Sequence, residues 1–251
     1  MPESDLRVLI EAARAAGDVA RRFDGPSAKL WHKPDDAGPV TEADLAVNEL
    51  LHQRLTQARP DYGWLSEETE DGAARLQTQR VFVIDPIDGT VNYFYSIPHF
   101  AVSIALRRNG KIVVGVIYDP MRDEMWSVRE GQPALLNGQP IAVSTRTQLS
   151  ESIVSVGVSK SLNSINRGLP LFEKMVRGAK KCRMMGSASL DIAYVSCGRL
   201  DAYIESMISL WDVAAGILLV ESAGGRVDLT PHESAADKYG IVATSGLIPI
   251  E

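Results

Sequence analysis

Asp85-Pro86-Ile87-Asp88-Gly89-Thr90 follows directly on the apolar run 81–84. Proline disfavours helical backbone angles in the residue before it, so Asp85 should end a strand rather than enter a helix. Gly89 permits a tight turn, or a close backbone approach that a larger residue would block. Asp88 comes soon enough after Asp85 for both carboxylates to share one cation. The stretch therefore predicts a strand that ends in an acidic turn.

The backbone of this turn offers a second chemical feature. The N–H groups of Gly89, Thr90 and Val91 could face an anion, as N–H groups do at helix N-termini. Carboxylates beside such amides need a cation between them, and oxygen ligands without His or Cys favour Mg²⁺ over zinc. Taken alone, the pattern is as typical of a turn in which Asp caps local backbone groups.

Acids elsewhere in the chain favour the metal interpretation. Glu67 and Glu68 follow the apolar residue Leu65 closely, and Asp212 stands at the start of an apolar stretch. Separately, Glu67 is explained as a solvated loop carboxylate and Asp212 as an N-cap or first-turn acid. Two unneutralised charges about 4 Å apart would repel by on the order of 4 kcal/mol at an effective dielectric constant of about 20. Several acids at element ends near one glycine turn therefore fit a metal cluster better.

Composition excludes several classes of protein. The 251 residues are 45% hydrophobic with a formal charge of -6, which argues against disorder and against a broad nucleic-acid surface. No apolar run approaches the roughly 20 residues that span a bilayer, and residues 1–5 lack a secretory pattern. Two cysteines cannot form a disulfide framework. We expect a soluble, cytoplasmic protein without nucleic-acid or membrane partners.

The pattern of apolar residues predicts a mixed fold. Helical spacing covers 5–23 and a second helix should begin at Thr41 and end before Pro60, whereas Asn109-Gly110 predicts a hairpin between 102–106 and 112–118. The further expected strands are 62–65, 81–84, 141–143, 153–158 and 202–205, and the further expected helices are 171–177, 187–197 and 211–223. Helices segregated around largely antiparallel strands indicate an α+β fold.

A division near residue 148 is also expected. Residues 1–148 would form an α+β half that carries most of the metal ligands. Residues 149–251 would form an α/β half that carries Asp212 and the substrate contacts. We expect the two halves to pack tightly, with the site between them.

Two stretches resemble the signatures of the inositol monophosphatase family. These are residues 85–93 (DPIDGTVNY) and residues 211–225 (WDVAAGILLVESAGG), and the likeness extends from about residue 33 to 242. The resemblance implies a layered αβαβα sugar-phosphatase fold with mostly antiparallel sheets, Mg²⁺-dependent phosphomonoesterase activity and a homodimer. One departure is Val91, where the family often has a second threonine.

The resemblance also implies a set of metal ligands. Glu67, Asp85 and the backbone carbonyl of Ile87 would hold one Mg²⁺, and Asp85, Asp88 and Asp212 would hold a second. A third, weaker ion would share Glu67 with water, so that two to three ions bind, with Mn²⁺ as a possible substitute.

The same resemblance implies catalytic roles for Glu67, Asp44 and Thr90. Asp44 and Thr90 would orient the attacking water. Asp44 also fits a capping box with Thr41, and both roles are compatible. Lys33 is a further candidate that ranks below the acids. The residues expected to contact substrate are Asp88, Gly89, Thr90, Gly186, Ser187, Ala188, Glu205 and Asp212.

The implied substrate is a small-molecule phosphate ester, inositol monophosphate or a similar polyol phosphate. Related alternatives are a 3'(2'),5'-bisphosphate nucleotidase, a histidinol-phosphatase and a fructose-1,6-bisphosphatase. A different alternative is a non-catalytic regulatory binding protein, because some bacterial members of the family associate with the transcription machinery.

Overall fold

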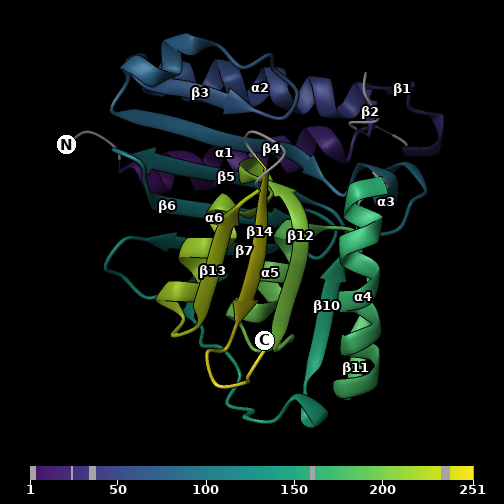
Figure 1. The fold of residues 1–251 in the computed structure, drawn as a ribbon. Helices are drawn as coiled ribbons and strands as arrows, with labels where there is room; N and C mark the ends of the chain where they lie inside the picture. Colours follow the sequence, from purple (N-terminus) through teal and green to yellow (C-terminus); the bar gives the residue numbers. More distant parts are fainter. Residues whose placement is uncertain (1–3, 24, 34–37, 159–161, 233–237, 251) are drawn as a thin grey trace.

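The molecule stacks helices and sheets in alternating layers (Figure 1). A computed structural model describes residues 4–23, 25–33, 38–158, 162–232 and 238–250. The layers run in the order helices, sheet, helices, sheet, helix, as the family resemblance implies. Among the helices that the structure describes, none is long and apolar enough to cross a bilayer.

The first two layers are a helix pair and a seven-stranded sheet. Helices α1 (Asp5–Ala20) and α2 (Glu42–Ala58) bury their apolar faces on one side of this sheet. The strand order is β3-β4-β5-β6-β7-β8-β9. The strands are β3 (Gly63–Ser66), β4 (Arg80–Asp88), β5 (Ala101–Arg108), β6 (Lys111–Asp119), β7 (Glu124–Arg129), β8 (Leu135–Leu136) and β9 (Gln139–Pro140).

Two helices, α5 (Ala188–Ser196) and α6 (Leu210–Ser222), separate this sheet from a five-stranded one with the order β11-β10-β12-β14-β13. Its outer face is covered by α4 (Leu162–Gly178) (Figure 1). Its strands are β10 (Ile153–Gly157), β11 (Lys181–Arg183), β12 (Ala202–Ser209), β13 (Arg226–Pro231) and β14 (Lys238–Thr244). The shorter elements are β1 (Leu30–His32), β2 (Pro39–Thr41), α3 (Thr90–Phe94) and 3₁₀ turns at Gly25–Ser27, Ala73–Gln77 and Leu149–Glu151.

Strand pairing is mostly antiparallel, which confirms the expected α+β class. The parallel pairs are β3 with β4, and β10 with both β11 and β12. Asn109-Gly110 forms the predicted hairpin turn, and both residues have the positive φ that such a turn requires. The domain boundary near residue 148 stays a prediction, since one apolar cluster around α5 and α6 draws residues from both sides of it.

Three expected elements differ from the structure. Strand β4 does not stop before Asp85 but continues to Asp88, with a shift of pairing register between the two aspartates. Pro86 has no N–H to donate, and a bulge accommodates it within the strand. Residues 141–143 are not a strand: the N–H groups of Ile141 and Val143 bond to carbonyls of Ala134 and Ala223.

Helix α4 is the third difference, because it begins at Leu162 and includes Pro170, well before the expected start at residue 171. Proline lacks the N–H for an interior helical bond, which is why the sequence pattern favours a later start. Packing against β10, β11 and β12 stabilises the longer helix.

Helix α6 lies unusually close to the large sheet, and glycine at position 115 of β6 permits this. A Cβ on Gly115 would lie 2.8 Å from the carbonyl oxygen and 3.0 Å from the Cα of Ala215. Both atoms belong to the helix backbone, so they cannot move aside as a flexible side chain would. The close approach matters for function because α6 carries Asp212 in its first turn.

We expect Gly115→Val to lower the free energy of unfolding by about 1–3 kcal/mol, because the added side chain forces α6 away from β6. Urea denaturation followed by circular dichroism measures the change. Gly72→Val is the matched control, since a Cβ there meets no atom within 4 Å, and it should change stability by no more than about 0.5 kcal/mol. Equal stability of the two variants would contradict the packing argument.

Candidate functional site

Three carboxylates meet where β3 and β4 end and α6 begins. The structure places one carboxylate oxygen from each of Glu67, Asp85 and Asp212 within 4.8 Å of the others. Parallel pairing of β3 with β4 aligns Ser66 with Ile84, and the Glu67 N–H donates to the Ile84 carbonyl at 3.1 Å. The side chain of Asp212 joins them from the first turn of α6.

Of the three carboxylates, that of Asp85 lowers the stability of the folded protein most, because it is buried without a hydrogen-bond partner among the described residues. Its side chain is 1% exposed, and neither carboxylate oxygen has a hydrogen-bond donor among the described residues. Burial raises the pKa of Asp85 well above its ordinary value, and the charges of Glu67, Asp88 and Asp212 raise it further. A buried carboxylate without partners is unfavourable unless a cation neutralises it. Oxygen-only donors suit a hard divalent ion such as Mg²⁺, so the residues present fit the metal that the sequence implies.

The carboxylate of Asp212 is also repelled by neighbouring carboxylates, but it has one backbone hydrogen-bond donor. Its Oδ2 accepts a hydrogen bond from the N–H of Ser209 at 3.0 Å, which completes a capping box at the start of α6. Burial raises the pKa of Asp212 well above its ordinary value, and the negative charges of Glu67 and Asp88 raise it further. The local role as a first-turn acid and the role in the acidic cluster are therefore both present.

Among the described residues, Asp88 lies beside this three-carboxylate group rather than in it. Its Oδ2 accepts hydrogen bonds from the Ser187 hydroxyl at 2.5 Å and the Ser189 N–H at 2.7 Å. Burial raises the pKa of Asp88 to about 6, despite these two hydrogen bonds. Its Oδ1 has no hydrogen-bond donor in the part of the chain that the structure describes. The prediction that Asp88 is a metal ligand stays a prediction.

Gly89 makes the tight turn that the sequence predicts. Its φ of +94° is in the left-handed region, and it caps the N-terminus of α3, whose first residue is Thr90. A Cβ on Gly89 would lie 3.2 Å from the carbonyl oxygen of Gly186 and 3.3 Å from the Cβ of Ser187. Glycine thus lets the acidic turn reach the start of α5, where Ser187 is the N-cap and Ala188 the first residue.

Asp44 has both of its predicted interactions. Its Oδ2 accepts hydrogen bonds from the Thr41 hydroxyl and from the Thr41 N–H at 2.8 Å, so the capping box of α2 is confirmed. Its Oδ1 accepts the Thr90 hydroxyl at 3.0 Å. The same Thr90 hydroxyl lies 3.1 Å from the Ile87 carbonyl. The cap therefore holds Asp44 against the acidic turn.

Lys33, the weaker candidate of the sequence analysis, lies in direct contact with two of the acids. Its ammonium group lies 2.7 Å from an oxygen of Glu67 and 2.7 Å from an oxygen of Glu68. Burial alone would lower the pKa of Lys33, but the charges of both glutamates outweigh it and raise the pKa. The pKa of Glu68 is raised to about 7, first by burial and then by Glu67. Lys33 thus neutralises part of the cluster and leaves Asp85 without a counter-charge.

The predicted substrate residue Glu205 lies on β12, partly buried, and accepts a hydrogen bond from the hydroxyl of Tyr203. Burial raises the pKa of Glu205 to about 7, and the charge of Asp88 contributes.

The sequence does not predict the roles of two polar residues, Ser189 and Lys238. Ser189 donates its N–H to Asp88 and its hydroxyl to the Asp212 carbonyl at 2.8 Å. Lys238 donates to the hydroxyl of Ser209 at 2.5 Å. Ser189 directly follows the predicted residues 186–188, so its neighbourhood was identified. Nothing local to Lys238 points to the site.

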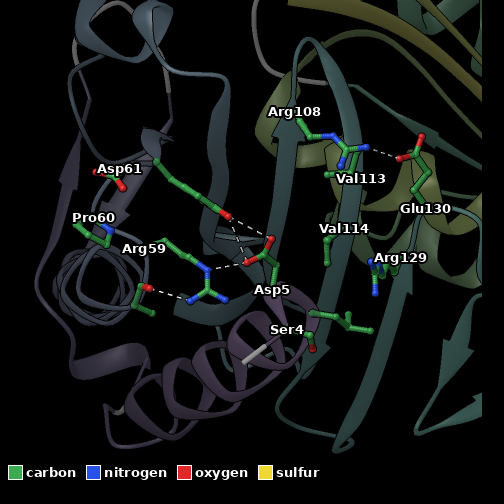
Figure 2. Close-up of a pocket in the computed structure, with 13 residues that line it drawn as sticks. Ser4, Asp5, Arg59, Pro60, Asp61, Arg108, Val113, Val114, Arg129 and Glu130 are labelled. Carbon is green, nitrogen blue, oxygen red and sulfur yellow. Dashed lines mark hydrogen bonds and ion pairs between the residues drawn. The ribbon is translucent and has the colours of Figure 1, made fainter. Parts of the chain in front are cut away.

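A cavity of about 650 Å³ lies at the opposite end of β5 and β6 from the acids (Figure 2). Two of the three arginines that line it pair with acids: Arg59 bonds to Asp5 at 2.7 Å, and Arg108 to Glu130 at 3.0 Å. These pairs neutralise part of the charge that lines the cavity, whereas the acidic cluster leaves Asp85 without a partner among the described residues, so the cluster is the stronger candidate site.

Comparisons with known proteins agree with this geometry. A family model described as the inositol monophosphatase family matches residues 1–248. An inositol-1-monophosphatase of Mesorhizobium japonicum is 37% identical and covers 97% of this chain and 92% of its own length. A Nus factor SuhB of Xylella fastidiosa is 38% identical, with coverage of 90% and 82%. The crystal structure of extragenic suppressor protein suhB from Bartonella henselae superposes with a TM-score of 0.88, at 35% identity, over 96% of this chain and 93% of that one.

The raised pKa values predict how stability depends on pH and metal. Asp85 and Asp212 have raised pKa values and Asp88 has a pKa of about 6. Such acids reduce the free energy of unfolding as the pH rises from their unfolded pKa, near 4, through their folded pKa. We expect Mg²⁺ to raise the Tm, relative to EDTA, more at about pH 8 than at about pH 5, because at the lower pH protons compete for Asp85, Asp88 and Asp212. At a hundred times the Kd, binding adds about 2.7 kcal/mol.

Asp85→Asn is the control for this experiment. The variant removes the unpartnered charge, so in EDTA at about pH 8 it should have a higher Tm than the unaltered protein. It should also lose most of the Mg²⁺-dependent increase. Differential scanning calorimetry measures both effects, and an undiminished increase in the variant would exclude Asp85 as a ligand.

Proposed function

The chain belongs to the inositol monophosphatase family of metal-dependent phosphatases, and from this premise we propose that it hydrolyses inositol monophosphate, or a similar polyol phosphate, to the free alcohol and phosphate. The observation that carries the proposal is the convergence of Glu67, Asp85 and Asp212 within 4.8 Å. Phosphoryl transfer depends on positioning and charge neutralisation more than on a covalent nucleophile, and such a group supports that chemistry.

We assign Glu67, Asp85 and the Ile87 carbonyl to one Mg²⁺, and Asp85, Asp88 and Asp212 to a second; a third, weaker ion would share Glu67 with water. When bound, such ions neutralise the phosphate and the departing oxygen, and they lower the pKa of water. The donor set supports this assignment, since Asp85 has two unpartnered buried oxygens and Asp88 has one oxygen without a donor in the described part of the chain.

Thr90 and Asp44 would orient the attacking water. Because the hydroxyl hydrogen of Thr90 points to Asp44 Oδ1 or to the Ile87 carbonyl, the lone pairs of Thr90 Oγ1 stay available to accept a hydrogen bond from water. Burial raises the pKa of Asp44 above its ordinary value, which suits Oδ1 to receive a proton through Thr90. Glu67 would share in activating the same water.

The start of α5 and Glu205 would bind the leaving alcohol. Ser187 and Ala188 stand at the N-terminus of α5, where backbone N–H groups have no helical partner. Gly186 approaches the acidic turn through Gly89. Glu205 would accept hydrogen bonds from substrate hydroxyls, while N–H groups at Gly89 and Thr90 face the phosphate.

The first test is the release of phosphate from inositol 1-phosphate with and without Mg²⁺. We expect activity that depends on Mg²⁺ and a fall in kcat of at least about 10²-fold in Asp88→Asn, because charge stabilisation at the phosphate is lost. A malachite green assay measures the product. Equal activity of Asp88→Asn and the unaltered protein would end the proposal.

Thr90→Val separates water orientation from metal binding. The variant keeps the shape of the side chain but not its hydroxyl, so we expect kcat to fall by about 10²-fold with little change in KM. The Mg²⁺-dependent rise in Tm should persist, in contrast to Asp85→Asn. Loss of that rise would assign Thr90 to metal binding instead.

Substrate choice within the family needs a panel of phosphate esters. We expect a higher kcat/KM for inositol 1-phosphate than for 3'-phosphoadenosine 5'-phosphate, histidinol phosphate or fructose 1,6-bisphosphate. A reversed order would replace the polyol assignment with the corresponding alternative.

A regulatory binding role is a second candidate, because the Xylella fastidiosa relative is named a Nus factor. Asp88→Asn distinguishes the two roles in cells: a deletion phenotype that this variant rescues would favour binding over turnover. The homodimer implied by the family resemblance likewise remains a proposal, which sedimentation equilibrium would test.

A further inference from the structure

Two neighbours, Tyr203 and Gly157, fix the position of the Glu205 carboxylate. Neither of them has a role in the proposed catalytic site. Tyr203 and Glu205 are two residues apart on β12, so their side chains lie on the same face of the strand. The Tyr203 hydroxyl donates to Glu205 Oε2. Tyr203 is 1% exposed, so its ring cannot turn away from this contact without disturbing the core. A buried phenol that donates to a carboxylate fixes that carboxylate more firmly than a solvated partner would.

The second neighbour of Glu205 is Gly157, on the adjacent strand β10. Parallel pairing of β10 with β12 sets Gly157 directly opposite Glu205 and Ser155 opposite Tyr203. A Cβ on Gly157 would overlap Glu205 Oε2 and would lie 2.6 Å from both the Glu205 carboxyl carbon and the Tyr203 hydroxyl oxygen. The carboxylate therefore lies across the bare backbone of β10, in space that any other residue would fill.

A register shift completes the arrangement. Pairing between β12 and β14 is regular up to Glu205 and resumes at Ile208, so a bulge follows Glu205 directly. Bulges redirect a strand and its side chains and are common beside functional sites. Glu205 Oε2 is occupied by Tyr203, whereas Oε1 has no hydrogen-bond donor among the described residues.

We propose that Tyr203 is a positioning residue for substrate recognition: its hydroxyl, with the space left by Gly157, orients Glu205 so that Oε1 faces the hydroxyl groups of the leaving alcohol. The proposal rests on the proposed function, because it deepens the role assigned to Glu205. Tyr203 itself touches no substrate and acts through Glu205.

The charges around Glu205 show why it needs this support. Burial and the negative charges of Asp88 and Asp191 raise its pKa, while the hydrogen bond from Tyr203 and the ammonium of Lys238 lower it. Without the phenol, Glu205 would be protonated over more of the neutral range. A protonated carboxyl donates from one oxygen and loses its fixed orientation, so it accepts hydroxyl hydrogens less well.

The test compares two esters that differ in the leaving group. For Tyr203→Phe, we expect kcat/KM for inositol 1-phosphate to fall by about tenfold or more, mainly through KM, while kcat/KM for 4-nitrophenyl phosphate stays within about twofold. The second ester has no alcohol hydroxyls for Glu205 to bind. Tyr118→Phe is the matched control, because Tyr118 is also buried and donates to a carboxylate, Asp123, at 2.9 Å. It should leave both values within about twofold.

Two further variants identify the route of the effect. Gly157→Ala should reproduce the selective loss, because the methyl group displaces the Glu205 carboxylate. In a Glu205→Gln background, Tyr203→Phe should cause no further change in selectivity, since the two residues act as a unit. Equal losses on both esters, or an undiminished effect of Tyr203→Phe in the Glu205→Gln background, would overturn the proposal.

A readout without turnover separates this proposal from the proposed function. Carbon-detected NMR titration of the glutamate carboxyls should show a higher pKa for Glu205 in Tyr203→Phe and no change in Tyr118→Phe. An unchanged pKa would overturn the positioning role even if the enzyme hydrolyses inositol 1-phosphate. Failure to hydrolyse any polyol phosphate would instead reject the proposed function and with it the substrate contact.

Discussion

Electrostatic repulsion among one buried and two half-buried carboxylates is the constraint on which the rest of this structure depends. Glu67, Asp85 and Asp212 come from three separate elements and share one small volume. Lys33 compensates Glu67 and Glu68, but the two buried oxygens of Asp85 have no donor in the described chain. The folded protein therefore carries an unfavourable charge distribution that divalent ions would relieve. Functional sites commonly carry such a cost in stability, which the surrounding scaffold offsets.

That scaffold consists of close backbone contacts that bring the two signature stretches together. Gly89 lets the acidic turn approach the start of α5, and Gly115 lets α6 lie against β6. Ser189 joins both stretches, because its N–H bonds to Asp88 and its hydroxyl to the Asp212 carbonyl. Each contact tolerates little added volume, so the positions of the acids are set by packing that extends through the middle helix layer.

The carboxylate of Glu205, the proposed substrate contact, is held differently from the acids of the cluster. Asp88 and Asp212 each accept a hydrogen bond from a backbone N–H at the start of a helix. Glu205 instead accepts one from the Tyr203 hydroxyl and occupies the space left by Gly157 on the neighbouring strand. If the proposed roles hold, Glu205 on β12 is supported by β10 and β12, whereas the proposed metal ligands Asp85 and Asp212 lie on β4 and α6. Such separation would allow the family to change its alcohol specificity while it keeps its phosphate chemistry, since function depends on sites placed on a shared fold.

The amino-acid sequence by itself determined the helices with clear caps, the Asn109-Gly110 hairpin, the turn at Gly89 and the identity of the acids, because these depend on local backbone preferences and on recognisable signature stretches. It did not predict that β4 continues past Pro86, that α4 begins at Leu162, or that β7, β11, β13 and β14 form. Strands β11 and β14 pair with strands far along the chain, and α4 depends on packing against β10, β11 and β12. Only the tertiary structure decided which oxygens are left without partners and which residues orient Glu205. Asp88 meets Ser189 across a separation of 101 residues, and Gly157 meets Glu205 only through the pairing of β10 with β12. Contacts of that kind exist only after the sheets have formed, so no local pattern in the sequence carries them.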